Sequence, residues 1–95
     1  MAVHVGLLTA TLSFDESFSL KDKRRVLKSL LEKLRNELRV SAAETAFQNR
    51  MRTGEIAVAF LGVNRGVIER SRRRAEDILS SDPRCKLDAC IWEWL

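Results

Sequence analysis

The sequence contains few of the residues on which catalysis, disulfide cross-links or membrane insertion depend. It has two cysteines, one histidine and four glycines in 95 residues. Two cysteines do not form the disulfide framework of a small secreted domain, and no phosphate-loop, dinucleotide-binding or hydrolase motif is present. The longest uncharged apolar run covers only residues 56–63, whereas a membrane-spanning helix needs about 20 such residues.

The first residues also lack the basic region and small-residue cleavage site of a secretory signal, so we expect a cytoplasmic protein that does not contact membranes. What the chain does contain is 45% hydrophobic and 32% charged residues, with a net charge of +4. A chain of this length closes one core but has no room for a catalytic domain beside a binding domain. We therefore expect residues 1–95 to form a single domain.

The N-terminal half predicts a strand followed by a long helix. Residues 3–14 alternate with a period of two, and their even-numbered side stays apolar to the end, so we assign that side to the core. Residues 20–39 then predict a helix whose apolar stripe is about 140° wide. Ser19 and Asp22 approximate a capping box at its start.

The C-terminal half predicts three strands and one helix. Residues 40–47 form a weakly patterned strand, residues 48–54 a loop and residues 55–61 a buried strand. Asn64 is the expected N-cap of a helix over residues 65–80, and alternation from residue 85 predicts a last strand.

The element order predicts a ferredoxin-like α/β sandwich of the α+β class. Two linked strand–helix–strand units give a four-stranded antiparallel sheet with two helices on one face. The other face is left bare, and the alternation lines it with Val5, Leu7, Ala57, Ala59, Cys90, Trp92 and Trp94.

A bare apolar face more often meets protein than nucleic acid. The expected homodimer interface consists of Val5, Leu7, Ala57, Ala59, Trp92 and Trp94. Base stacking on Trp92 or Trp94 and plain packing of the last strand are the alternatives.

The first helix carries the clearest functional signal. Residues 19–39 have a net charge of +5, which exceeds that of the whole chain. Their cations form a one-sided strip and crowd the first turn, where the helix dipole is positive and each cation costs about 0.3 to 1 kcal/mol. A phosphate at that end would meet free backbone N–H groups and basic side chains together. The candidate nucleic-acid-binding residues are Lys21, Lys23, Arg24, Arg25, Lys28, Arg35 and Arg39.

Two readings compete with this hypothesis: a solvated helix face with a basic bias, and a site for another anion. Arg50 and Arg52 in the loop could add secondary basic contacts. On the second helix, the spacing of Arg72 and Glu76 predicts an internally compensated, solvated face.

Catalysis has little support in the sequence. Residues 15–18 are acidic where a phosphate-binding loop would need arginine, and His4 has no evident catalytic partner. Cys85 and Cys90 are five apart on a strand, so they should point to opposite faces and cannot form a two-cysteine metal clip without a bulge. We expect a protein that is not an enzyme and that has no cofactor, metal or small-molecule substrate.

Residues 19–30, with the sequence SLKDKRRVLKSL, closely resemble the signature of the bacterial YlxP-like family. Further similar positions are His4-Val5-Gly6, Val40-Ser41 and Ala43-Glu44. The resemblance implies a ferredoxin-like fold and a domain of unknown function. It also implies work on RNA or the ribosome, since such members are often encoded beside translation-initiation and ribosome-maturation factors.

The function expected from the sequence is therefore that of an RNA- or ribosome-associated accessory factor that binds phosphate backbone through its first helix. The alternative is a protein-interaction module that homodimerises through its open sheet face.

Overall fold

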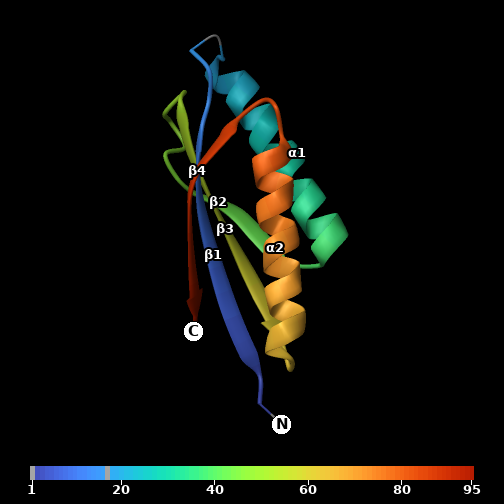
Figure 1. Cartoon of the computed structure of the whole chain (residues 1–95). Coiled ribbons are helices and arrows are strands. Elements are labelled where there is room, and N and C mark those ends of the chain that lie inside the picture. Colours follow the sequence, from blue (N-terminus) through green and yellow to red (C-terminus); the bar gives the residue numbers. More distant parts are fainter. Residues whose placement is uncertain (1, 17) are drawn as a thin grey trace.

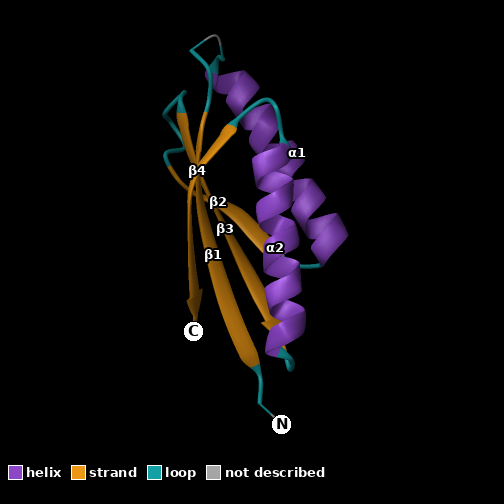
Figure 2. Cartoon of the chain, viewed as in Figure 1, coloured by secondary structure: helices purple, strands orange, loops and turns teal. Residues whose placement is uncertain are grey.

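The computed structural model describes residues 2–16 and 18–95. In chain order the elements are β1 (His4–Ser13), α1 (Leu20–Leu38), β2 (Ser41–Ala46), β3 (Thr53–Gly62), α2 (Arg65–Ser81) and β4 (Lys86–Trp94). The strands form one antiparallel sheet in the order β2-β3-β1-β4. Both helices lie on the same face of this sheet (Figures 1 and 2), which confirms the ferredoxin-like fold. Neither helix has the length and apolar content to cross a membrane within the described residues.

The core forms between the helices and the face of the sheet that they cover. The even-numbered side of β1 supplies Leu8, Ala10 and Leu12, each with 0% exposure, as the alternation predicts. α1 buries the middle of its apolar stripe against the sheet, through Val26, Leu27, Leu30 and Leu34.

Both helices begin at the predicted caps. The hydroxyl of Ser19 accepts from the backbone N–H of Asp22 at 3.1 Å, and the carboxylate of Asp22 accepts from the backbone N–H of Ser19 at 3.0 Å, which completes the capping box. The side chain of Asn64 accepts from the backbone N–H of Val67 at 3.2 Å. These contacts satisfy N–H groups that have no partner inside the helix.

The sequence-based assignment of faces in β4 is wrong. Cys90, Trp92 and Trp94 do not lie on the bare face: Trp92 pairs with Leu8 and Cys90 with Ala10, both of which face the helices. The cause is a β-bulge. Thr11 and Leu12 are neighbours in β1, but their partners in β4, Ala89 and Leu87, are two residues apart. An extra residue in one strand reverses the side-chain alternation beyond it. Cys85 and Cys90 consequently both face the helix layer.

Trp92 occupies the space over Gly6 in the neighbouring strand. A Cβ at Gly6 would lie 2.1 Å from the Trp92 ring, so only glycine fits there. The Trp92 ring lies 5.5 Å from that of Phe60, and the guanidinium of Arg72 on α2 lies 5.1 Å above it. The ring is therefore a structural contact between sheet and helix.

We predict that Trp92→Ala lowers the free energy of unfolding by about 2 to 4 kcal/mol, since it removes a large ring from the helix-covered face. Ile91→Ala, on the exposed face of the same strand, should cost less than about 1 kcal/mol. Urea denaturation followed by circular dichroism measures both. A larger effect for Ile91→Ala than for Trp92→Ala would contradict this assignment of faces.

Candidate nucleic-acid interface

Four predicted cations form a continuous exposed surface on α1, which we call the basic face: Lys21, Arg24, Arg25 and Lys28. They lie opposite the residues that α1 buries in the core. Among residues 2–16 and 18–95, no carboxylate oxygen lies within 4.0 Å of their charged nitrogens. The charge of this face is therefore available to an external anion.

Lys23 does not belong to the basic face, which corrects the sequence-based prediction. Its side chain has 0% exposure, because it falls within the buried sector of α1. The ammonium donates to the carbonyl oxygens of Phe47 and Arg50, each at 2.6 Å, and lies 3.8 Å from the carboxylate of Glu44 on β2. Burial lowers the pKa of Lys23, while the nearby Glu44 opposes that change.

These contacts hold the loop between β2 and β3 against the first turns of α1. The Phe47 backbone is in the left-handed region, with φ of 63°, which costs free energy for a residue other than glycine. The Phe47 carbonyl accepts both from Lys23 and from the backbone N–H of Arg50. Lys23 thus positions the loop that carries the two predicted secondary contacts.

The arginines of this loop have different surroundings. The guanidinium of Arg50 lies 5.2 Å from the ring centroid of Phe47, which keeps it close to the loop. Arg52 reaches 3.6 Å from the carboxylate of Glu16, but both side chains are largely solvated, so this pair contributes little. Arg50 extends the positive surface next to α1, whereas Arg52 is partly compensated.

Arg35 and Arg39 lie further along α1 and do not join the basic face. The guanidinium of Arg35 donates to the backbone carbonyl of Ala42, which ties it to the edge strand β2. Arg39 is the C-cap of α1, with φ of 53°, and borders a hollow at the opposite end of the molecule. Of the seven predicted residues, Lys23 is buried, four are exposed at the start of the helix, and Arg35 and Arg39 are exposed nearer its end.

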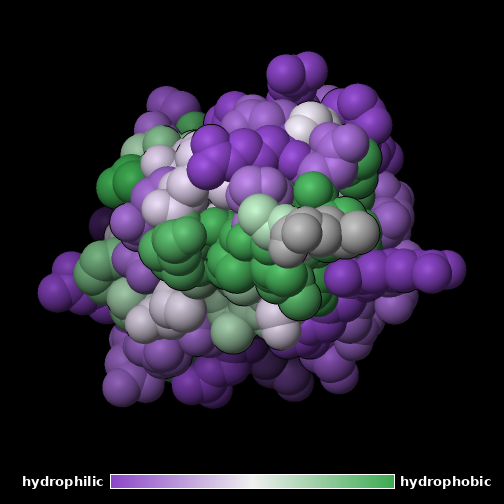
Figure 3. All heavy atoms as spheres, turned by 90° about the horizontal axis from the view of Figure 1, so that it is seen from below, coloured by the Kyte–Doolittle hydropathy of each residue, from purple (hydrophilic) through white to green (hydrophobic). Residues whose placement is uncertain are grey.

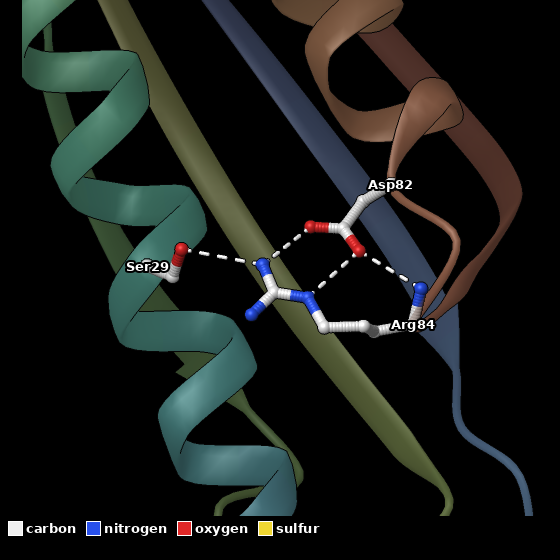
Figure 4. Close-up of polar contacts among 3 residues, drawn as sticks. All are labelled: Ser29, Asp82 and Arg84. Atoms are coloured by element: carbon white, nitrogen blue, oxygen red, sulfur yellow. Dashed lines mark hydrogen bonds and ion pairs between the residues drawn. The ribbon is translucent and has the colours of Figure 1, made fainter.

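Sequence reasoning missed Arg84, which joins the α2–β4 loop to α1 (Figure 4). Its guanidinium donates to the Asp82 carboxylate through Nε at 3.0 Å and Nη2 at 2.6 Å, and Nη2 also reaches the Ser29 hydroxyl at 3.2 Å. Hydrogen bonds to Asp82 raise the pKa of Arg84, and those from Arg84 lower the pKa of Asp82. No sequence spacing signals this contact, because Ser29 lies 55 residues away.

Two arginines of α2 form ion pairs within the fold. Arg72 binds Glu76 at 3.0 Å, as predicted, and Glu69 at 2.8 Å. Arg74 reaches Glu37 of α1 at 3.0 Å. Residues 65–81 contain five arginines and three acidic side chains, so α2 is compensated only in part.

The open sheet face is apolar, although the tryptophans are absent from it. Val5, Leu7, Ala57 and Ala59 lie there half-buried, as predicted. Leu61 and Ile91, which the sequence analysis did not include, add exposed apolar surface at 74% and 64% exposure. Figure 3 shows the apolar surface at the end of the molecule near the N-terminus, where the structure also exposes Val3, Val63, Val67 and Leu95.

Cys85 and His4 have structural surroundings, whereas Cys90 is exposed. Burial raises the pKa of Cys85 to about 11, which keeps it a thiol at neutral pH. His4 accepts from Arg65 at 3.3 Å and contacts the ring of Trp94. Residues 2–16 and 18–95 contain no group of three or more His, Cys, Asp or Glu arranged to hold a metal ion.

A ferredoxin-like sheet with one exposed basic helix start defines the structural class of this protein. The family described as "Protein of unknown function (DUF503)" matches residues 5–90, and the chain belongs to that family. The chain is also 29% identical over 76 residues to "Uncharacterized protein YlxP" of Bacillus subtilis (strain 168), which covers 80% of this chain and 83% of the relative. These matches confirm the resemblance carried by residues 19–30.

We predict that Lys23→Met lowers the free energy of unfolding by about 2 to 4 kcal/mol, because it leaves two carbonyls and Glu44 without their cation. Lys28→Met removes the same charge from the exposed face and should cost less than about 0.5 kcal/mol. Denaturant titration of the two variants gives this difference. Equal stability would show that Lys23 is not the group that secures the loop.

Proposed function

We propose that this protein is a cytoplasmic, non-enzymatic accessory factor that binds structured RNA, with ribosomal RNA as the leading candidate. The basic face supplies the contact and binds phosphates of the backbone, so the interaction is independent of base sequence along most of its length. Arg50 contributes from the adjoining loop. In this proposal the protein acts by binding, which agrees with the structural contacts of His4 with Arg65 and Trp94.

The observation that supports the proposal is the exposure of four cations on one side of α1, where Asp22 is a nearby anion that interacts with Arg25 and Lys21. Exposed cations near the positive end of a helix are unfavourable unless an anion offsets them. Arg72 of α2, by contrast, forms ion pairs with Glu69 and Glu76. An external polyanion is the partner that this contrast favours.

We predict that the affinity for a structured RNA falls steeply with salt, because binding releases counterions from the phosphates. Replacing Arg24, Arg25 and Lys28 together by glutamine should reduce the magnitude of the slope of log K against log salt by about 2 to 3. Filter binding or fluorescence anisotropy at several salt concentrations measures this slope.

The matched control replaces three cations of α2, Arg65, Arg70 and Arg73, by glutamine and so removes the same charge. It should change the slope by less than about 1. An affinity independent of salt, or an equal effect of the two triple variants, would refute binding through the basic face.

The open sheet face favours a second candidate function, homodimerisation. A shallow hollow of about 200 Å³ runs over the small side chains of β2 and β3 beside Leu7. A second copy could seat an apolar side chain there, and the exposed Leu61 and Ile91 lie on the same face.

We predict that, if this face mediates association, wild-type protein shows a concentration-dependent sedimentation coefficient and Leu7→Lys shifts it to that of a monomer. Ser41→Lys, at the rim of the same hollow, tests the position independently. A wild-type protein that sediments as a monomer at every concentration would remove this candidate.

A further inference from the structure

A second recognition element lies next to the basic face, where the start of α1 meets the α2–β4 loop. Here a hollow of about 310 Å³ is lined by Phe18, Asp22, Arg25, Val26 and Arg84. We call it the Phe18 hollow. It joins the basic face through Arg25, and its volume lies at the lower end of the range of small-molecule sites, about 300 to 1,000 Å³.

Arg84 forms one wall of the hollow with its guanidinium held in place. Asp82 accepts from the backbone N–H of Arg84 at 2.8 Å and binds the guanidinium through Nε and Nη2, while Ser29 accepts from Nη2 (Figure 4). The remaining nitrogen, Nη1, has no hydrogen-bond partner among the residues that the structure describes. A guanidinium already fixed in this way loses little conformational entropy when a ligand packs against its plane or binds Nη1.

Phe18 supplies an aromatic surface. Its ring lies 6.0 Å from that of Phe14 in the core, so the core supports one side of Phe18. Half-buried, it also lines the hollow. Aromatic rings and guanidinium planes are the surfaces on which proteins stack the unpaired bases of RNA.

The charges at the hollow balance, and the excess of positive charge beside it belongs to the basic face that Arg25 joins. Arg25 is exposed and has no ion pair in the described chain. Asp22 also lines the hollow; its hydrogen bonds with Ser19 lower its pKa most and the charge of Arg25 lowers it further, while Asp82 binds Arg84. Glu16 on the preceding loop is directed to Arg52 at 3.6 Å. A phosphate therefore meets Arg25 and the free Nη1 of Arg84.

We propose that the Phe18 hollow receives one unpaired nucleotide of the bound RNA, with its base against Phe18 and Arg84 and its phosphate beside Arg25. This inference rests on the proposed function and specifies its target. The preferred RNA has a bulged or looped-out nucleotide next to a helical stem, and the basic face holds the phosphates of the stem.

The test compares two hairpins with the same stem, one fully paired and one with a single bulged 2-aminopurine. Wild-type protein should bind the bulged hairpin about 5- to 150-fold more tightly, the range expected for stacking of one base on an aromatic side chain. The fluorescence of 2-aminopurine should change on binding, because it responds to stacking.

Phe18→Leu keeps an apolar side chain against Phe14 and should lose the preference for the bulge while retaining salt-dependent binding of the paired hairpin. That retained binding shows that the variant is folded. Phe18→Tyr keeps the ring and should restore the preference. Trp94→Leu removes an aromatic side chain at the other end of the molecule and should leave the preference unchanged.

Equal affinity of wild-type protein for the two hairpins, or a bulge preference that persists in Phe18→Leu, would overturn the inference but leave binding by the basic face intact. If neither hairpin binds at low salt, the proposed function and this inference fail together. Free adenosine monophosphate is the probe for a mononucleotide site. Full competition by it at concentrations near the protein's own would assign the hollow to free nucleotides and overturn the inference.

Discussion

The one-sided packing of α1 on the sheet determines where each of its charges can lie. Burial of Val26, Leu27, Leu30 and Leu34 fixes the rotation of the helix about its axis. Side chains on the opposite side must then point to solvent, since a helix places residues of one face three or four positions apart. Lys23 is the charged residue that falls in the buried sector, and the chain provides two carbonyls and a carboxylate for it. The same rotation that exposes the basic face thus requires the polar contacts that hold the neighbouring loop.

Much of this arrangement could be predicted because it depends on local periodicity. The leucine stripe, the capping box at Ser19 and the alternation of β1 each involve residues a few positions apart, and each matches the structure. The exposure of the other cations can be predicted from the leucine stripe, because side chains outside the stripe face solvent. Lys23 was predicted incorrectly because it was grouped with the cations of the first turn, although the helical spacing places it in the middle of the buried sector, three and four positions before Val26 and Leu27. Its acceptors belong to Phe47 and Arg50, more than 20 residues away.

The faces of β4 could not be predicted for a related reason. Alternation assigns faces only while the strand pairs residue for residue, and a bulge breaks this correspondence. The bulge opposite Thr11 and Leu12 reverses the alternation, so Trp92 packs over Gly6 and Ile91 is exposed instead. The role of Arg84 was not predicted for the same reason, because its partner Ser29 belongs to another element. The faces of β4 and the position of Arg84 both depend on contacts between different elements. Such contacts leave no periodic pattern in a single sequence.

The fold separates two kinds of surface along its 49 Å length. The start of α1, with the basic face and the Phe18 hollow, lies at one end, and the exposed apolar residues Val63 and Val67 lie at the other, near the chain's N-terminus (Figure 1). A polyanion bound at the first end leaves the second end and much of the open sheet face uncovered. The two proposed contacts should respond oppositely to salt, since added salt screens charge attraction whereas salts such as sulfate strengthen apolar burial. RNA binding and self-association are therefore compatible in one molecule, and salt dependence separates their contributions.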